Sequence, residues 1–134
     1  MTLLVPNNGE GDALAYYVNK SAPQDLVLKL FKNNYTPVEG SVASDFTEAD
    51  FTGYSALTLT GASWAVTEGA PSHADYAQQT FSSSAGSQNQ NVYGYYLVRA
   101  TSGRIAHAER FADGPYNIVN NGDQVKVTPV ITLD

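Results

Sequence analysis

The chain has 134 residues, a net charge of −6 and no cysteine. Its seven lysines and arginines are scattered between Lys20 and Lys126 and form no basic stripe. Because such a stripe is needed to neutralise phosphates, we expect the chain to bind neither nucleic acid nor an anionic membrane. The lack of cysteine excludes disulfides, thiolate zinc sites and cysteine nucleophiles.

The composition predicts a β-rich protein with part of its surface covered by neighbours. Charged residues make up 15% of the chain, below the usual value of about 25%. Threonine, serine, asparagine, glutamine and tyrosine take their place, which favours strands and turns. Tyrosine is also enriched at protein interfaces, where lysine and glutamate are depleted. The length suits one domain, residues 1–134, with one core.

The first residues predict an N-terminal arm followed by one helix. Residues 1–8 contain Leu3, Leu4 and Val5 before Pro6, without the basic start and long apolar core of a secretory signal. We expect no segment that spans a membrane, because no apolar run approaches about 20 residues. From residue 10 to residue 20 the spacing becomes helical and places Leu14, Tyr17 and Val18 on one face.

Short strands and turns fill the rest of the chain. Alternation predicts a half-buried strand over 25–32 and strands over 54–60 and 63–67 that join tightly around Gly61. Residues 33–43 read as loop, and residues 44–53 as loop or one helical turn. Residues 116–119 form a short apolar piece. Further strands are predicted over 74–83 and 124–133, the latter at an edge or bulged because Pro129 lacks a backbone donor.

The clearest local signal is a hairpin over residues 91–111. Two runs of β-favouring residues flank the polar turn 101–104, which contains Gly103. Tyr93, Tyr95 and Tyr96 make the first run rich in aromatic residues. Because both faces of this strand carry apolar side chains, we expect one face to meet the core. We expect the other to meet the rim of the second sheet or a neighbouring subunit.

Seven or eight short strands with turns about ten residues apart are typical of an antiparallel β-sandwich or jelly roll. The predicted fold class is therefore mainly β, with one short N-terminal helix. No internal repeat or linker divides the chain.

Few residues are candidates for metal or acid–base chemistry. His73 with Asp75, and His107 with Glu109, each share one face of a strand and could begin such a site. With two histidines and no cysteine we expect no metal site, and for His107 the ordinary role is a hydrogen-bonded strand residue. Three further carboxylates, Asp45, Glu48 and Asp50, could hold calcium, but they lack the spacing and glycine of an EF-hand.

We expect no catalytic activity and no cofactor. The stretch around Ser63 lacks the final glycine of a nucleophile elbow and lies between two strands. The Gly9-Glu10-Gly11 segment lacks the third glycine of a dinucleotide fingerprint. Trp64 and the nine tyrosines could instead form a platform for stacking sugars, although packing is their commoner role.

Several stretches, taken together, resemble a known class of protein. They are Leu3–Asn7 with Gly9-Glu10, then 25–30, 33–37, 76–80, 91–96, 108–111, 113–116 and 121–125. With these stretches nearly the whole chain resembles small structural proteins of tailed bacteriophages, including those of cyanophages. Among them it is most like the capsid decoration, or cement, proteins, which are small, β-rich, often trimeric and placed on the outside of the head.

The resemblance implies a location in the virion after assembly in the host cytoplasm. It also implies two partners, the phage major capsid protein and further copies of the chain, most often as a trimer. As interface residues we predict Leu3, Leu4 and Val5 of the arm, which could add to a neighbour's sheet edge, and the hairpin tyrosines Tyr93, Tyr95 and Tyr96. The alternatives are a tail or neck component, a carbohydrate-binding module, or a hydrolase that uses His73 or His107.

Overall fold

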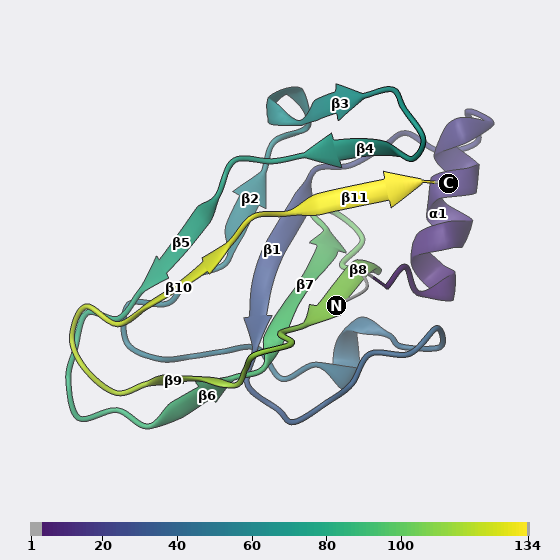
Figure 1. The fold of residues 1–134 in the computed structure, drawn as a ribbon. Helices are drawn as coiled ribbons and strands as arrows, with labels where there is room; N and C mark the ends of the chain where they lie inside the picture. Colours follow the sequence, from purple (N-terminus) through teal and green to yellow (C-terminus); the bar gives the residue numbers. More distant parts are fainter. Residues whose placement is uncertain (1–3, 134) are drawn as a thin grey trace.

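The structure, a computed structural model, describes residues 4–133 and is mainly β (Figure 1). Within these residues the strands number eleven and form antiparallel sheets, beside one α-helix and two short 3-10 helices. In chain order the elements are α1 (Asn7–Tyr17), β1 (Leu26–Phe31), η1 (Ala43–Asp45), β2 (Leu57–Leu59), η2 (Gly61–Ser63), β3 (Ala65–Thr67), β4 (Ser72–Asp75), β5 (Gln79–Ser82), β6 (Gln90–Val92), β7 (Gly94–Arg99), β8 (Ile105–Arg110), β9 (Tyr116–Ile118), β10 (Gln124–Val127) and β11 (Val130–Leu133). The predicted fold class is confirmed, and the arrangement is consistent with a β-sandwich.

The central sheet has the strand order β2-β1-β7-β8. Strands β1 and β7 pair along their whole length, from Leu26 opposite Arg99 to Phe31 opposite Gly94. Strands β7 and β8 form the hairpin predicted over 91–111, and their register shifts between Leu97 and Val98. The strongest local signal in the sequence therefore forms the middle of this sheet.

The second layer is built on two long strands that pair with each other, each of them divided in the middle. Strand β4 is followed by β5 and strand β10 by β11, in the pairings β11-β4-β3 and β10-β5 (Figure 1). The predicted strand over 124–133 is interrupted at Thr128 and Pro129, because proline has no N–H to donate to a ladder. The carbonyl of Pro129 still accepts a 3.0 Å hydrogen bond from the backbone of Tyr76. Such divisions account for much of the difference between the observed strand count and the predicted one.

The two strands that the sequence joins around Gly61 do form, but in different sheets. Strand β2 pairs with β1 in the central sheet, whereas β3 pairs with β4 in the second layer. The 3-10 turn η2 connects them, and the carboxylate of Asp25 accepts a 2.8 Å hydrogen bond from the Gly61 N–H. The tight connection predicted around Gly61 is therefore a corner between the two layers.

The main core lies between the layers. It combines Leu28, Leu30 and Leu97 of the central sheet with Phe81 and Val125 of the second layer. All five side chains are buried, which follows from the alternation of apolar residues along their strands.

A smaller core covers the opposite face of the central sheet. Phe46, from the loop between β1 and β2, stacks on Tyr96 with ring centroids 4.7 Å apart and meets Phe31 edge-on at 5.1 Å. Strand β7 is thus covered on both sides by its own chain. The second cover is this loop, rather than the sheet rim or neighbouring subunit that we expected.

Helix α1 begins three residues earlier than predicted and ends at Tyr17. Pro6 precedes it, and the carbonyl of Pro6 accepts the first helical hydrogen bond from Glu10. Asn19 ends the turn that follows with a φ of 58°, a conformation that asparagine tolerates better than most residues. Among residues 4–133, no helix is long and apolar enough to cross a membrane.

Candidate functional site

The two histidine pairs take up different environments. His73 and Asp75 lie on the same face of β4 as predicted, and His73 Nε2 is 3.2 Å from Asp75 Oδ2. The carboxylate of Glu109, in contrast, accepts a 2.8 Å hydrogen bond from the hydroxyl of Tyr95, and His107 Nδ1 has no hydrogen-bond partner among the described residues. The structure therefore brings together only one of the two predicted pairs.

The side chain of His107 is not the hydrogen-bonded strand histidine that we expected. Its Nδ1 atom is inaccessible to solvent and has no hydrogen-bond partner among the described residues. Burial first, and the charge of Arg99 second, lower the pKa of His107 to about 4. A neutral imidazole in such a place packs against its surroundings, and a proton on it would be costly.

The three carboxylates of residues 45–50 point to separate partners. Glu48 forms a 3.1 Å ion pair with Lys29, and Asp50 forms one of 2.7 Å with Lys32. Asp45 accepts a 2.8 Å hydrogen bond from the backbone of Val42 and so closes the turn η1. Within residues 4–133 no group of three or more acidic, histidine or cysteine side chains could hold a metal ion.

Trp64 is half-buried at the corner between the two layers. Its ring meets that of Tyr76 edge-on, with centroids 5.1 Å apart. The hydroxyl of Tyr76 accepts a hydrogen bond from the Thr60 N–H. Trp64 and Tyr76 therefore form an aromatic pair, in which the hydroxyl of Tyr76 is already bonded to the backbone of the corner.

The hairpin tyrosines differ in how much surface they offer. Tyr95 and Tyr96 belong to the two cores and are each 4% exposed. Tyr93 is half-buried, with the guanidinium of Arg110 5.2 Å from its ring centroid. Of the three predicted interface tyrosines, only Tyr93 retains a usable surface for a neighbour.

The predicted N-terminal arm, as far as it is described, is part of the fold. Leu3 lies outside the described residues. Leu4 pairs with Ala108 of β8 through two backbone hydrogen bonds of 3.0 and 3.1 Å, and Pro6 is fully buried. The segment therefore covers the edge of its own sheet, whereas we had expected it to pair with the sheet edge of a neighbouring subunit. A sheet edge covered in this way is protected from unwanted pairing. Val5 remains half-exposed.

Three large side chains in and just after α1 point away from the protein's own core. Leu14 and Val18 are each 65% exposed and Tyr17 is 89% exposed. The sequence places these three residues on one face of a helix, and such a face normally packs inward. In this protein the face points outward, because the helix contacts the sheet through Gly9, Asp12 and Tyr16.

These side chains border an open groove between α1 and the end of β11. The groove has a volume of about 460 Å³. It is lined by Val5, Glu10, Ala13, Leu14, Tyr17 and Leu133. Leu133, which is 71% exposed, also borders an apolar hollow over β3, β4 and β11. We call the six lining residues together with Val18 the α1 surface.

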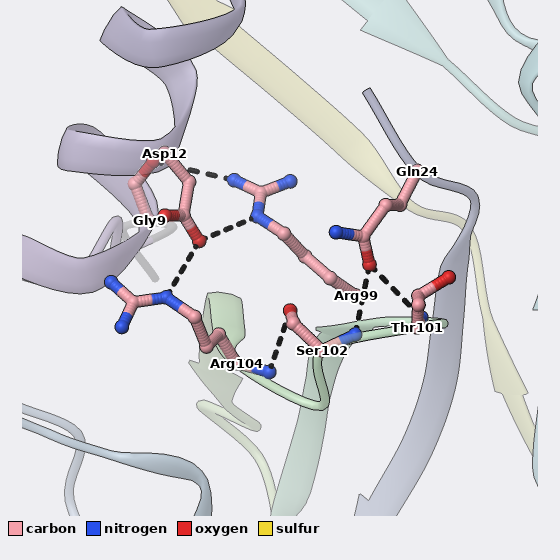
Figure 2. A network of polar contacts seen from close by, with 7 residues as sticks. All are labelled: Gly9, Asp12, Gln24, Arg99, Thr101, Ser102 and Arg104. Carbon is pink, nitrogen blue, oxygen red and sulfur yellow. Dashed lines mark hydrogen bonds and ion pairs between the residues drawn. The ribbon is translucent and has the colours of Figure 1, made fainter. Parts of the chain in front are cut away.

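A group of polar contacts, which we call the helix anchor, holds α1 in place (Figure 2). Asp12 Oδ2 accepts hydrogen bonds from Arg99 Nε at 2.9 Å and from Arg104 Nε at 3.1 Å. Arg99 also lies 4.6 Å from the ring centroid of Tyr16 and donates to the carbonyl of Gly9. Both arginines belong to the β7–β8 hairpin, so the anchor ties the helix directly to the central sheet.

Close backbone packing completes the anchor. A Cβ atom at Gly9 would collide with the carbonyl of Ala106 in β8, so only glycine allows α1 to approach this strand so closely. At the hairpin turn, Gln24 accepts backbone hydrogen bonds from Thr101 at 2.9 Å and Ser102 at 3.0 Å (Figure 2). Close packing therefore fixes α1 against β8, and Gln24 fixes the hairpin turn between Arg99 and Arg104.

The charges in the anchor are matched. Burial alone would raise the pKa of Asp12, but the hydrogen bonds and charges of Arg104 and Arg99 outweigh burial and lower that pKa. Arg99 is only 6% exposed, and a buried cation needs such a partner. Sequence reasoning missed this pair, although an arginine at the end of an otherwise apolar strand was a usable signal.

No protein-family model, curated protein or solved structure matches this chain. The resemblance to phage virion proteins consequently stays a prediction.

Proposed function

We propose that this chain is a structural protein of a tailed-phage virion, in which it decorates the head and stabilises it as a cement protein. Its partners in this proposal are the major capsid protein and further copies of the chain. The observation that best supports an assembly role is the α1 surface, where Leu14, Tyr17 and Val18 are exposed on an anchored helix. Exposed apolar surface of this kind is typical of interaction sites.

The side chains singled out for chemistry also favour assembly over catalysis. Glu48 and Asp50 are each paired with a lysine in or just after β1, and so tie their loop to the central sheet. A cement protein requires a firm scaffold and contact surfaces, and repetition of a weak contact over a symmetric shell produces strong attachment.

The test is to locate and count the protein in purified phage particles. Quantitative mass spectrometry should find a copy number on the order of hundreds per particle, as a contact repeated over a shell requires. A copy number of about six or twelve, typical of a symmetric ring, would move the protein to the tail or neck. Its presence only in infected-cell lysate, and never in particles, would refute a virion role.

The carbohydrate-binding alternative rests on Trp64, which is half-buried beside Tyr76. Aromatic rings stack on sugars when one face is open. A glycan array distinguishes this role from an assembly role, because binding that disappears in Trp64→Ala would favour the module. No binding by the wild-type protein would remove this candidate.

A further inference from the structure

We propose that two copies of this chain associate about a two-fold axis, with their α1 helices packed antiparallel through the α1 surface. This inference deepens the proposed function, on whose homo-oligomer it rests, by naming the surface through which the copies meet. It replaces the trimer implied by the resemblance with a two-fold pair.

Helix α1 presents Leu14 and Tyr17 to solvent and does not use them in its own fold. Leu14 and Tyr17 line the groove beside Leu133 and are largely exposed. The helix is held to its own sheet by Asp12 and by the close approach of Gly9. A face that is both apolar and already held in position loses little entropy when a partner binds it.

The distribution of charge along the helix identifies the occupant. Glu10 lines the groove near the start of α1, and Lys20 lies exposed just beyond its end. Between Asp12 and Lys20 the chain has no charged residue, and Asp12 is paired with Arg99 and Arg104 of its own chain. The α1 surface together with Lys20 thus has an acid at one end, apolar side chains in the middle and a base at the other end.

A second copy placed antiparallel complements this order. The midpoint between residues 10 and 20 lies at residue 15, beside Leu14, so a two-fold axis there places Glu10 opposite the partner's Lys20 and repeats the contact on the other side. The same axis keeps Leu14 close to the partner's Leu14 and sets Tyr17 opposite the partner's Ala13, a residue that also lines the groove. It also opposes the two helix dipoles. A two-fold contact needs only one self-complementary surface, which this helix provides.

The experiment is light scattering of the purified full-length chain at concentrations up to about 100 µM, which populate a micromolar contact. The expected mass is twice the 14.3 kDa of one chain. Tyr17→Glu should weaken the association at least about 100-fold by placing two carboxylates in an apolar contact. The matched control is Val119→Glu, which alters another exposed apolar residue. Val119 follows β9, which lies on the opposite side of the molecule from α1 (Figure 1), so this variant should leave the mass unchanged.

A charge exchange tests the antiparallel arrangement itself. Glu10→Lys and Lys20→Glu should each weaken the association, because each sets like charges opposite one another, and the double variant should restore it. Circular dichroism of every variant should match the wild type, which separates loss of the contact from loss of the fold.

Several results would overturn the proposal. These are a 14.3 kDa monomer across this range, a trimer, a dimer that Tyr17→Glu does not affect, and a double variant that does not recover. A monomer whose Tyr17→Glu variant binds phage heads less well would assign the α1 surface to the capsid partner instead. None of these results depends on whether the protein is found in virions, so the two proposals can fail separately.

Discussion

The β7–β8 hairpin and helix α1 use apolar residues in opposite ways. All six residues of β7 are buried, whereas Leu14, Tyr17 and Val18 are exposed on α1. The hairpin lies between two cores, and the helix lies at the edge of the sheet, where it is held by ion pairs and one glycine contact. Apolar side chains in the hairpin therefore stabilise the fold, while those on the helix remain available for a partner.

The contrast between hairpin and helix also shows how polar contacts can attach a helix to a sheet. The attachment of α1 depends on Arg99 and Asp12, which are separated by 87 residues in the sequence. Such a polar attachment leaves the outward face of the helix free to be apolar. The following four experiments test this contrast.

The largest effect is expected in the hairpin. Leu97→Ala should lower the free energy of unfolding by about 2 to 5 kcal/mol, because it opens a cavity at a fully buried position in the main core. Urea unfolding followed by circular dichroism measures this change. A loss below about 1 kcal/mol would show that the hairpin is not the centre of the core.

Removing the anchor should have the next largest effect. Arg99→Ala should cost about 2 to 3 kcal/mol, since it removes a buried cation, its contact with Tyr16 and one partner of Asp12. The control is Arg104→Ala, whose side chain is far more exposed and which should cost less than about 1 kcal/mol. Equal losses in the same unfolding assay would contradict an anchor centred on Arg99.

The hairpin should also make the protein sensitive to acid through His107. An unfolded histidine has a pKa near 6.5, and that of His107 in the fold is about 4. As the pH falls below 6.5 the unfolded state binds the proton first, so stability should be constant above pH 7 and decrease toward pH 4. Between pH 7 and pH 5 the free energy of unfolding should decrease by about 2 kcal/mol.

The His107→Leu variant provides the control for this measurement. It removes the titrating group and should flatten the dependence between pH 7 and pH 5. Asp12, whose pKa is lowered, contributes stability that is lost only at more acidic pH and therefore does not disturb this window. An unchanged slope in the variant would assign the acid sensitivity to other groups.

The smallest effect is expected on α1. Leu14→Ala makes the same chemical change as Leu97→Ala, but at a position that is 65% exposed. The measurement uses about 1 µM chain, a concentration at which a contact weaker than micromolar is mostly dissociated. Under this condition Leu14→Ala should alter the free energy of unfolding by less than about 0.5 kcal/mol. A loss as large as that of Leu97→Ala would mean that the helix face packs inward after all.

Local patterns in the sequence were reliable where neighbouring residues decide the structure. Alternation predicted β1, and paired β runs around Gly103 predicted the central hairpin. The interruption of the last strand near Pro129 follows from the chemistry of one residue. The lack of cysteine likewise excludes thiolate chemistry whatever fold the chain adopts.

Patterns of chemical groups were less reliable, because their spacing in sequence does not reveal their partners. His107 and Glu109 share the spacing of His73 and Asp75, yet only the latter pair forms. Asp45, Glu48 and Asp50 are close in sequence but form no joint site, since the carboxylate of each contacts a different partner. The Asp12–Arg99 pair shows the converse, a contact that no local pattern contains.

The sequence by itself determined the mainly β class, the helix near the N-terminus and the hairpin, because these depend on residues a few positions apart. Tertiary structure alone decided that the loop carrying Phe46 covers the second face of β7, that β2 and β3 join different sheets, and that Leu4 pairs with β8. It also decided which face of α1 points outward, because the distant Arg99 orients that helix. Periodicity marks an apolar face, but only long-range contacts decide whether that face is buried.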